Sequence, residues 1–313
     1  MGKKGSKKGS DKGRKKAEKK ARKAAEAAAA AVGEGAILNG FADALRVGKG
    51  FVLADVDPSS TPAFDGGKSG GEAALAAGES ELGDLLERLW AESTAGASRS
   101  VLLVVQGMDT SGKGGIMRHV VSVNPEGVKA TAFKAPSDEE RKHDFLWRIE
   151  RALPGPGQLG VFDRSHYEDV LVVRVHDLVP EEVWRKRYAQ INAFEREVER
   201  SGTQVVKVML HLSKDEQRAR LQERLDRPDK HWKYNPGDVD ERSRWLDYME
   251  AYQTALDKCS TVGSPWYVVP ADRKWYARLA VQQLLLEALR EMHLQWPDAD
   301  FDVEVEKRRL SES

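Results

Sequence analysis

Residues 104–115, with the sequence VVQGMDTSGKGG, contain most of a phosphate-binding loop. In the usual pattern G-x-x-x-x-G-K-[ST], backbone N–H groups surround phosphate oxygens, the Lys reaches the outer phosphates, and the final hydroxyl binds Mg²⁺. Gly107, Gly112 and Lys113 occupy the corresponding positions, but Gly114 stands where the hydroxyl is expected. The loop therefore predicts phosphate chemistry, with the backbone of these three glycines and the Lys113 ammonium as phosphate ligands. It leaves open which group binds the metal.

Two aspartates are the candidates for binding that metal. Asp109 lies inside the loop, where a carboxylate repels phosphate unless a cation lies between them, and Asp163 follows an apolar run. Mg²⁺ prefers oxygen ligands, so the pair can replace the missing hydroxyl. Each residue also has a purely structural interpretation, because Asp is common in turns and at the start of helices. Their strand contexts favour the metal site, and Arg164, next to Asp163, can neutralise charge on the transferred group.

An alternation of strands and helices is expected to position these residues. Apolar runs predict strands at residues 101–105, 128–133, 159–162, 205–212 and 266–269, and helical patterns lie around 82–89, 145–149, 167–178, 181–200 and 275–292. Capping boxes at residues 137–140 and 213–216 precede helices. The alternation implies a parallel sheet covered by helices on both faces, an α/β fold. Ligands bind beyond the carboxyl ends of such strands, where the glycine loop and Asp163 lie.

A basic segment over residues 218–238 predicts a lid. Its sequence, RARLQERLDRPDKHWKYNPGD, begins as a helix and then passes two prolines. In a phosphotransferase such a mobile segment closes basic side chains over the phosphates and excludes water. The other interpretation is a solvated basic helix followed by a loop.

Composition indicates a globular protein with an unusual N-terminus. The chain has 313 residues, 40% of them hydrophobic, which suffices for a sizeable core. No apolar run is long enough for a membrane span and no signal-peptide core is present, so we expect a cytoplasmic protein that does not contact membranes. The single Cys259 cannot form an intramolecular disulfide, in agreement with a reducing compartment.

The net charge of zero averages two unlike parts of the chain. Residues 1–23 contain 12 Lys and Arg against 2 acidic residues, a net charge of +10, so the rest contains 38 against 48, a net charge of −10. Residues 1–35 lack large apolar side chains and predict a disordered basic tail, which is either an arm that contacts nucleic acid or another polyanion, or a solvated tail without a partner. We expect a loosely packed N-terminal extension over 36–80, a phosphotransferase domain over 81–297, and a C-terminal tail over 298–313.

Four long motifs together resemble the second polyphosphate kinase family. They are QGMDTSGKGG at 106–115, FKAPSDEERKHDFLWR at 133–148, FDRSHYEDVLVVRVH at 162–176 and RPDKHWKYNPGD at 227–238. The resemblance covers residues 51–296 and implies a P-loop kinase fold and Mg²⁺-dependent phosphoryl transfer between inorganic polyphosphate and a nucleotide, without a covalent phosphoenzyme. The KAPS stretch is similar to the subgroup that accepts AMP as well as ADP. Gly114 departs from the family, in which many members carry Asp.

The resemblance also implies roles for individual residues. Asp109 and Asp163 engage Mg²⁺, Lys113 is the loop lysine, and Arg164 is the arginine of the D-R-S motif. The basic residues of the lid fall on Arg220, Arg224, Lys230 and Lys233, with Arg224 among the catalytic groups. Candidates for the walls of a polyphosphate channel are Arg118, Lys134 and Arg148. We also expect a homo-oligomer, whose size the sequence does not reveal.

Two other functions share parts of this pattern. A nucleoside monophosphate kinase that uses ATP as donor has the same fold, loop and lid, but its loop normally keeps a Ser or Thr after the Lys, and Gly114 argues against it. A nonenzymatic nucleic-acid binder would work through the basic tail.

Overall fold

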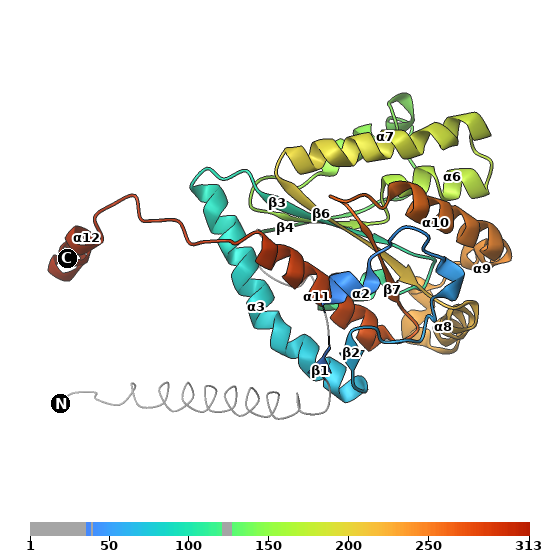
Figure 1. Ribbon diagram of the computed structural model, residues 1–313, viewed down its shortest axis with the longest axis horizontal. Helices are drawn as coiled ribbons and strands as arrows, with labels where there is room; N and C mark the ends of the chain where they lie inside the picture. The colour runs from blue at the N-terminus through green and yellow to red at the C-terminus, as the bar shows by residue number, and fades with distance from the viewer. Residues whose placement is uncertain (1–35, 39, 121–126) are drawn as a thin grey trace, which may run out of the picture.

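The computed structural model describes residues 36–38, 40–120 and 127–313, and in this part strands and helices alternate along the chain (Figure 1). The predicted basic tail over residues 1–35 lies outside the described residues.

A five-stranded parallel sheet forms the centre of the molecule. Its strands lie in the order β4 (Val128–Ala132), β5 (Leu159–Asp163), β3 (Ser100–Gln106), β6 (Thr203–His211) and β7 (Trp266–Pro270). All five were predicted from apolar runs. The runs of β3, β5 and β7 are nearly continuous and buried, as is typical of strands covered on both faces, whereas the edge strand β4 includes Lys129 and Thr131 and has no buried residue. The α/β fold class inferred from the sequence is confirmed.

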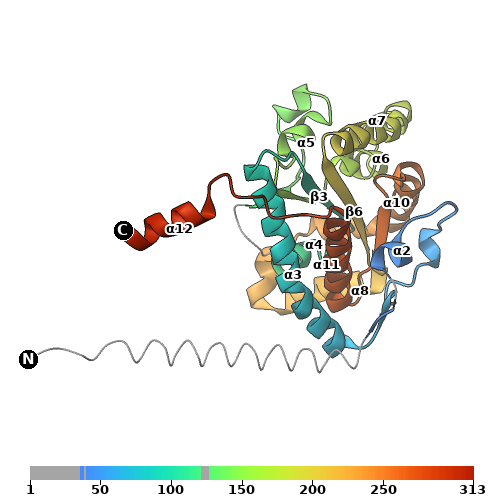
Figure 2. The same ribbon diagram turned by 60° about the vertical axis from the view of Figure 1, so that its left-hand side comes forward.

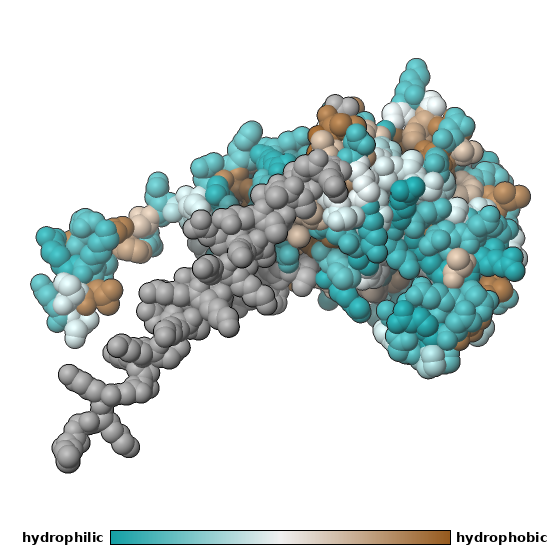
Figure 3. Space-filling model, turned by 90° about the horizontal axis from the view of Figure 1, so that it is seen from below, coloured by the Kyte–Doolittle hydropathy of each residue, from teal (hydrophilic) through white to brown (hydrophobic). Residues whose placement is uncertain are grey.

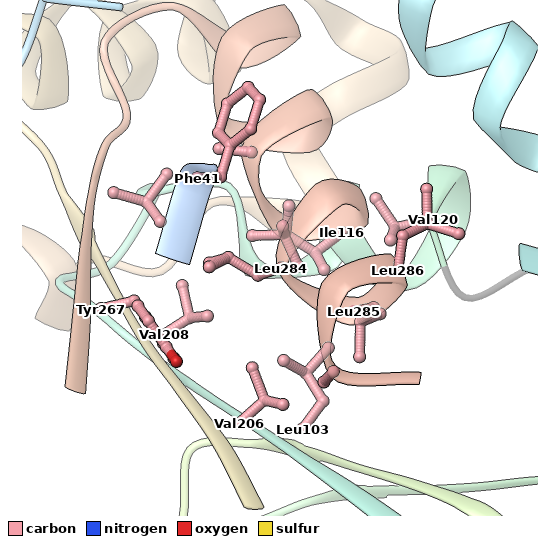
Figure 4. Packing of buried hydrophobic residues seen from close by; sticks show 14 of the residues in the cluster. Phe41, Leu103, Ile116, Val120, Val206, Val208, Tyr267, Leu284, Leu285 and Leu286 are labelled. Carbon is pink, nitrogen blue, oxygen red and sulfur yellow. The ribbon is translucent and has the colours of Figure 1, made fainter. Parts of the chain in front are cut away.

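Helices cover both faces of this sheet (Figures 1 and 2). Val101, Leu103 and Val105 of β3 pack in one hydrophobic cluster, and Leu102 and Val104 pack in the other, as the alternation of side chains along a strand requires. The first cluster includes side chains of α2 (Phe41–Leu45), α3 (Lys68–Thr94), α4 (Lys113–His119) and α11 (Lys274–Glu291), some of which appear in Figure 4. The second includes side chains of α5 (Trp147–Ala152), α6 (Val172–Val175), α7 (Glu181–Arg200) and α10 (Trp245–Cys259).

The segment before α3 is firmly attached to the body. The short strands β1 (Ala36–Ile37) and β2 (Phe64–Asp65) pair with each other, and a 3₁₀ turn, η2, spans Leu53–Asp55. Phe41 is fully buried (Figure 4), and both carboxylate oxygens of Glu287 accept hydrogen bonds from the backbone of Phe41 and Ala42 at 2.8 Å. The loose packing expected for residues 36–80 is therefore wrong, because apolar side chains of this segment pack in both hydrophobic clusters, Phe41 and Phe64 in the first and Leu53 in the second.

Three short helices form the region predicted as a lid. They are α8 (Lys214–Asp226), the 3₁₀ helix η6 (Pro228–Lys233) and α9 (Gly237–Ser243). Ser213 caps α8 by accepting from the Glu216 N–H at 3.1 Å, which is one half of the predicted capping box, but its own N–H donates to Asp272 and not to Glu216. The capping box at Ser137 and Glu140 forms with both hydrogen bonds, but it precedes only the 3₁₀ turn η4 (Glu140–Lys142).

The C-terminal helix α12 (Val303–Glu312) projects away from the body in both ribbon views (Figures 1 and 2). The face of the molecule in Figure 3 is mainly hydrophilic, with hydrophobic side chains in small groups. Within the described ranges, no helix combines the length and the apolar character needed to cross a lipid bilayer.

Candidate active site

The glycine loop connects the carboxyl end of β3 to the first turn of α4. Gly107 and Gly112 have φ angles of +150° and +116°, which side chains other than glycine rarely adopt. A Cβ atom at Gly107 would lie 2.8 Å from both the Leu210 carbonyl oxygen and the Ser111 Oγ. The loop therefore needs glycine at this position for its conformation and for its close approach to β6.

Lys113 is the first residue of α4, and its side chain turns back into the loop. Its Nζ donates to the Gly107 carbonyl oxygen at 2.8 Å and lies 3.4 Å from that of Met108, and the residue is only 9% exposed. The ammonium group is therefore held in the centre of the phosphate-binding loop.

Asp109, Asp163 and Arg164 meet at the carboxyl ends of β3 and β5. Asp163 is in register with Val105, and the N–H of Arg164 donates to the Val105 carbonyl oxygen at 3.0 Å. Arg164 has a φ of +63° and donates from its guanidinium to the Asp109 Oδ1 at 2.8 Å. Burial lowers the pKa of Arg164, but Glu168, Asp109 and Asp163 more than offset that effect and raise it, so the guanidinium stays charged at any working pH.

Helix α8 holds the loop from the other side. Gln217 donates to the Asp109 carbonyl oxygen at 3.0 Å. The guanidinium of Arg220 donates to the carbonyl oxygens of Thr110, Ser111, Ala271 and Asp272 at distances from 2.7 to 3.1 Å, and its Nε bonds to Glu216. Arg220 is only 5% exposed, so its donors are used to fix the loop.

A basic cleft of about 790 Å³ opens beside the loop. Twelve residues predicted as site residues line it: Asp109, Gly112, Lys113, Gly114, Arg118, Lys134, Asp163, Arg164, Arg220, Arg224, Lys230 and Lys233. Lys274 and Arg278 of α11 add two further cations, against three carboxylates in all, from Asp109, Asp163 and Glu223. Burial, together with repulsion from Arg118 and Arg220, lowers the pKa of Arg278 although Glu72 opposes the shift. The cleft is suited to a polyanion.

A second cleft, of about 350 Å³, is also lined by Asp109 and Arg164. Its lining has an excess of acidic groups, and it includes Tyr248 and Tyr252. Five carboxylates, from Asp109, Glu168, Asp169, Asp238 and Glu241, face three cations, from Lys134, Arg148 and Arg164. Burial raises the pKa of Asp169 to about 6, although Arg187 and Arg148 oppose the shift. The two clefts thus differ in charge and share Asp109, Phe133, Lys134 and Arg164.

The structure places two of the predicted residues outside the basic cleft. Gly107 and Arg148 line only the acidic cleft. The guanidinium of Arg148 donates to the Lys134 carbonyl oxygen at 2.8 Å and lies 5.4 Å from the centre of the Phe133 ring. Arg148 therefore packs beneath the 133–136 segment, where it contacts that segment's backbone.

The lid residues line the basic cleft and are paired with acidic groups. Arg224 donates to the Lys233 carbonyl oxygen at 2.8 Å and to Asp238 at 3.1 Å, and Lys230 bonds to Glu223. Trp232, at the tip of η6, is 77% exposed, and Lys233 lies 4.8 Å from the centre of its ring. These contacts tie α8, η6 and α9 into one unit at the mouth of the cleft.

The carboxylates of Asp109 and Asp163 fit a magnesium ion. No group of three or more His, Cys, Asp or Glu residues with metal-ligand geometry occurs in the described part of the chain. Mg²⁺ is commonly bound by one or two carboxylates together with substrate phosphates and water, and both aspartates line the cleft beside the phosphate loop. These two carboxylates could hold such an ion together with its substrate.

Sequence reasoning missed the contribution of α11 and of Glu223. Lys274 and Arg278 lie one turn apart at the start of the closing helix, a spacing that places them on one face. That spacing was visible in the sequence, but only the fold brings this face to the glycine loop, where Arg278 lies 3.7 Å from the position of a Gly115 Cβ.

A strand, a glycine loop with its buried lysine, a helix and two carboxylates beside a basic cleft define a P-loop phosphotransferase. The chain belongs to the polyphosphate kinase 2 family, since the family described as Polyphosphate kinase 2 (PPK2) matches residues 68–297.

Individual relatives agree with this membership. The chain is 47% identical to the AMP/ADP-polyphosphate phosphotransferase of Meiothermus ruber over 251 residues, which cover 80% of this chain and 92% of the relative. It is 45% identical to the ADP-polyphosphate phosphotransferase of Rhodopseudomonas palustris over 69% of this chain and 78% of the relative. The crystal structure of Polyphosphate Kinase 2 from Arthrobacter aurescens TC1 superposes with a TM-score of 0.87 at 55% identity, over 88% of this chain and 98% of that one.

Proposed function

We propose that the protein transfers a phosphoryl group between inorganic polyphosphate in the basic cleft and a nucleotide in the acidic cleft. The observation that carries this proposal is the meeting of two clefts of opposite charge at Asp109 and Arg164. A polyphosphate chain needs many cations, whereas a nucleoside offers hydroxyl and amino groups that carboxylates can accept from. The terminal phosphates of the two substrates then meet at the residues that line both clefts.

Asp109 and Asp163 would hold Mg²⁺ at this junction. When bound, the ion would neutralise charge on the phosphate oxygens of the transferred group. Lys113 and the backbone N–H groups of the loop bind the phosphate beside it, and Arg164 donates to the group during transfer. The basic lid excludes water, which would otherwise compete as acceptor.

The acceptor needs no strong general base, because its attacking phosphate oxygen is already ionised. Positioning and charge therefore supply most of the rate, and the donor and acceptor sites adjoin, so transfer is direct and forms no covalent phosphoenzyme.

The acceptors are AMP and ADP. The Meiothermus ruber relative carries both nucleotides in its name, and it is 47% identical to this chain. The acidic wall of the second cleft favours a nucleoside with few phosphates, because each added phosphate brings negative charge close to Asp169, Asp238 and Glu241.

A product assay tests the proposal. The full chain is incubated with Mg²⁺, AMP or ADP, and either polyphosphate or ATP, and the nucleotide products are separated. We expect ADP and ATP to form from polyphosphate, whereas transfer from ATP alone would support a nucleoside monophosphate kinase and overturn the proposal.

Two substitutions test the metal ligands. Asp109→Asn and Asp163→Asn should each lower kcat by at least about 100-fold, because each removes a charge that positions the cation. Asp247→Asn, an exposed site on α10, is the matched control and should keep full activity. A near-normal rate in either cleft variant at ordinary Mg²⁺ concentration would remove that aspartate from the site.

The tail and the assembly of the protein also belong to this proposal. A chain that lacks residues 1–35 should keep most of its turnover, whereas a nucleic-acid binder would lose its affinity and its salt dependence. A cytoplasmic location, a homo-oligomer and the division into tail, extension, domain and C-terminal tail remain predictions.

A further inference from the structure

One carboxylate in the basic cleft has no part in the proposed metal site. Glu223 lies on α8, between the site residues Arg220 and Arg224, and it lines the cleft that we assign to polyphosphate. An anion at this place weakens the attraction of the cleft for its polyanionic substrate. The contacts of Glu223 show what it does there.

Three cations surround the carboxylate of Glu223. Lys230 donates from its Nζ to Oε1, Arg227 lies 3.3 Å from the same oxygen, and the Lys274 Nζ lies 3.6 Å from Oε2. Lys230 and Lys274 line the cleft themselves. The hydrogen bond from Lys230, with further help from Lys274, lowers the pKa of Glu223 to about 2, so the group is an anion at every working pH.

The two oxygens of the Glu223 carboxylate thus contact the ammonium groups of Lys230 and Lys274, as the oxygens of a phosphate group would. The side chains of Glu223, Lys230 and Lys274 are 39%, 24% and 48% exposed, so water screens both pairs. Exposed ion pairs of this kind contribute little to stability and break easily. The arrangement can therefore open when a stronger anion arrives.

We propose that Glu223 competes with polyphosphate for Lys230 and Lys274, and so determines how tightly donors of different chain length bind. The inference rests on the proposed binding of polyphosphate in the basic cleft. A phosphate group that binds these lysines must displace the carboxylate, which remains nearby and repels the chain. A long polyphosphate has other contacts in the cleft, including Arg118 and Arg278, whereas tripolyphosphate has few to spare. Glu223 therefore disfavours short chains more than long ones.

The test compares Glu223→Gln with Asp226→Asn in the full-length protein. Asp226 lies on the same helix, is exposed and does not line the cleft, so its variant controls for the loss of one negative charge. Calorimetry with Mg²⁺ and no nucleotide gives the Kd of inorganic tripolyphosphate and of a long polyphosphate, at low and at physiological salt. Thermal unfolding verifies that each variant is folded.

We expect Glu223→Gln to bind tripolyphosphate about three- to fivefold more tightly than the unmodified protein, the factor for an exposed ion pair. The gain should be smaller for the long chain and should shrink at higher salt. The KM of the nucleotide should stay unchanged.

Unchanged or weaker binding of tripolyphosphate by Glu223→Gln would overturn the inference, since it would mean that Glu223 only positions the lysines. An equal gain in Asp226→Asn would overturn it too, because any lost charge would then suffice. Either result with normal transfer from polyphosphate leaves the proposed function intact. Failure of the unmodified protein to bind or use polyphosphate would instead refute both.

Discussion

Substitution of Lys207 measures how much an unpaired buried charge lowers the free energy of unfolding of this protein. It lies in the middle of β6 and is fully buried. Its ammonium group donates to Glu195 at 2.5 Å, to the Tyr167 hydroxyl at 2.9 Å and to the Cys259 carbonyl oxygen at 2.7 Å, so all three of its donors are used. Glu195 also lies 3.1 Å from the Nε2 of His166.

Lys207→Met should lower the free energy of unfolding by about 3–5 kcal/mol, because it leaves the Glu195 carboxylate buried without its main partner. For a domain of this size that loss corresponds to a fall in Tm of about 10 °C. Urea unfolding at pH 7.5, followed by fluorescence, measures the free energy. Lys258→Met, on the exposed face of α10, is the control and should change stability by less than about 0.5 kcal/mol.

The loss of stability in Lys207→Met should depend on pH, and the pKa of Glu195 gives the direction. Burial raises the pKa of Glu195, but Lys207 and His166 outweigh it, so in the native protein the pKa is lowered below its usual value. A lowered pKa means that the carboxylate contributes stability above about pH 4.3 and loses it as the pH falls further. Without Lys207 burial dominates and the pKa rises, so the variant regains stability as the pH falls and Glu195 takes up a proton. The difference between the two proteins should therefore be smaller at pH 5 than at pH 7.5.

A double variant separates an unpaired charge from a packing defect. Lys207→Met with Glu195→Gln removes both charges and should recover most of the loss, with a coupling energy of about 2 kcal/mol or more. A single variant within about 1 kcal/mol of the unmodified protein, or a double variant no more stable than the single one, would refute this reasoning.

Three further substitutions test the site and its surroundings. Gly107→Ala should lower kcat by at least about 100-fold, because its Cβ would lie 2.8 Å from the Leu210 carbonyl oxygen, and steady-state kinetics measures this. Arg220→Lys should fail to restore the activity lost in Arg220→Ala, since a single ammonium group cannot replace a fork that bonds four carbonyl oxygens; equal rates in the lysine variant and the unmodified protein would contradict this. Because burial raises the pKa of Asp169 to about 6, ionisation of this carboxyl lowers the free energy of unfolding as the pH rises from 4 to 7. Asp169→Asn cannot ionise, so its free energy of unfolding, measured with urea, should fall by up to about 3 kcal/mol less than that of the unmodified protein over this range.

The sheet could be predicted from the sequence because its strands are mainly apolar, with interruptions only at positions such as Lys129 of β4 and Lys207 of β6. The helices were harder to predict. For example, α3 begins at Lys68, well before Leu82, the first of the leucines from which this helix was predicted. Gly71 and Gly78 lie inside this helix, although glycine has a low helix propensity. A Cβ atom at Gly71 would lie 2.2 Å from the Trp275 ring, and one at Gly78 would lie 2.5 Å from the Gln282 side chain. The glycines are required by the close packing of α3 on α11, a tertiary constraint that local pattern does not contain.

The helix predicted over residues 167–178 was wrong for a related reason. The chain forms a 3₁₀ turn, η5, at His166–Asp169 and a single turn of helix, α6, at Val172–Val175. Ser165, buried at the start of η5, accepts from the Tyr167 N–H at 3.2 Å, and the side chains of His166 and Tyr167 bond to Glu195 of α7. Tertiary hydrogen bonds thus set the backbone directly after Asp163 and Arg164, where the site needs a fixed geometry.

In the candidate site, too, the sequence predicts which residue types are present, whereas the fold determines what each residue contacts. From the sequence, the basic residues of the loop, the motifs and the lid are all assigned to phosphate binding or catalysis. The fold separates them, because Arg220 uses its donors on loop carbonyl oxygens and Arg148 packs against Phe133 beside the acidic cleft. A count of lid arginines therefore overstates the charge available to polyphosphate, while Arg278 of α11 restores part of it from an element with no phosphate motif. The number of basic residues can be read from the sequence. Whether each of them faces the cleft or donates to a carbonyl oxygen of the protein depends on the fold.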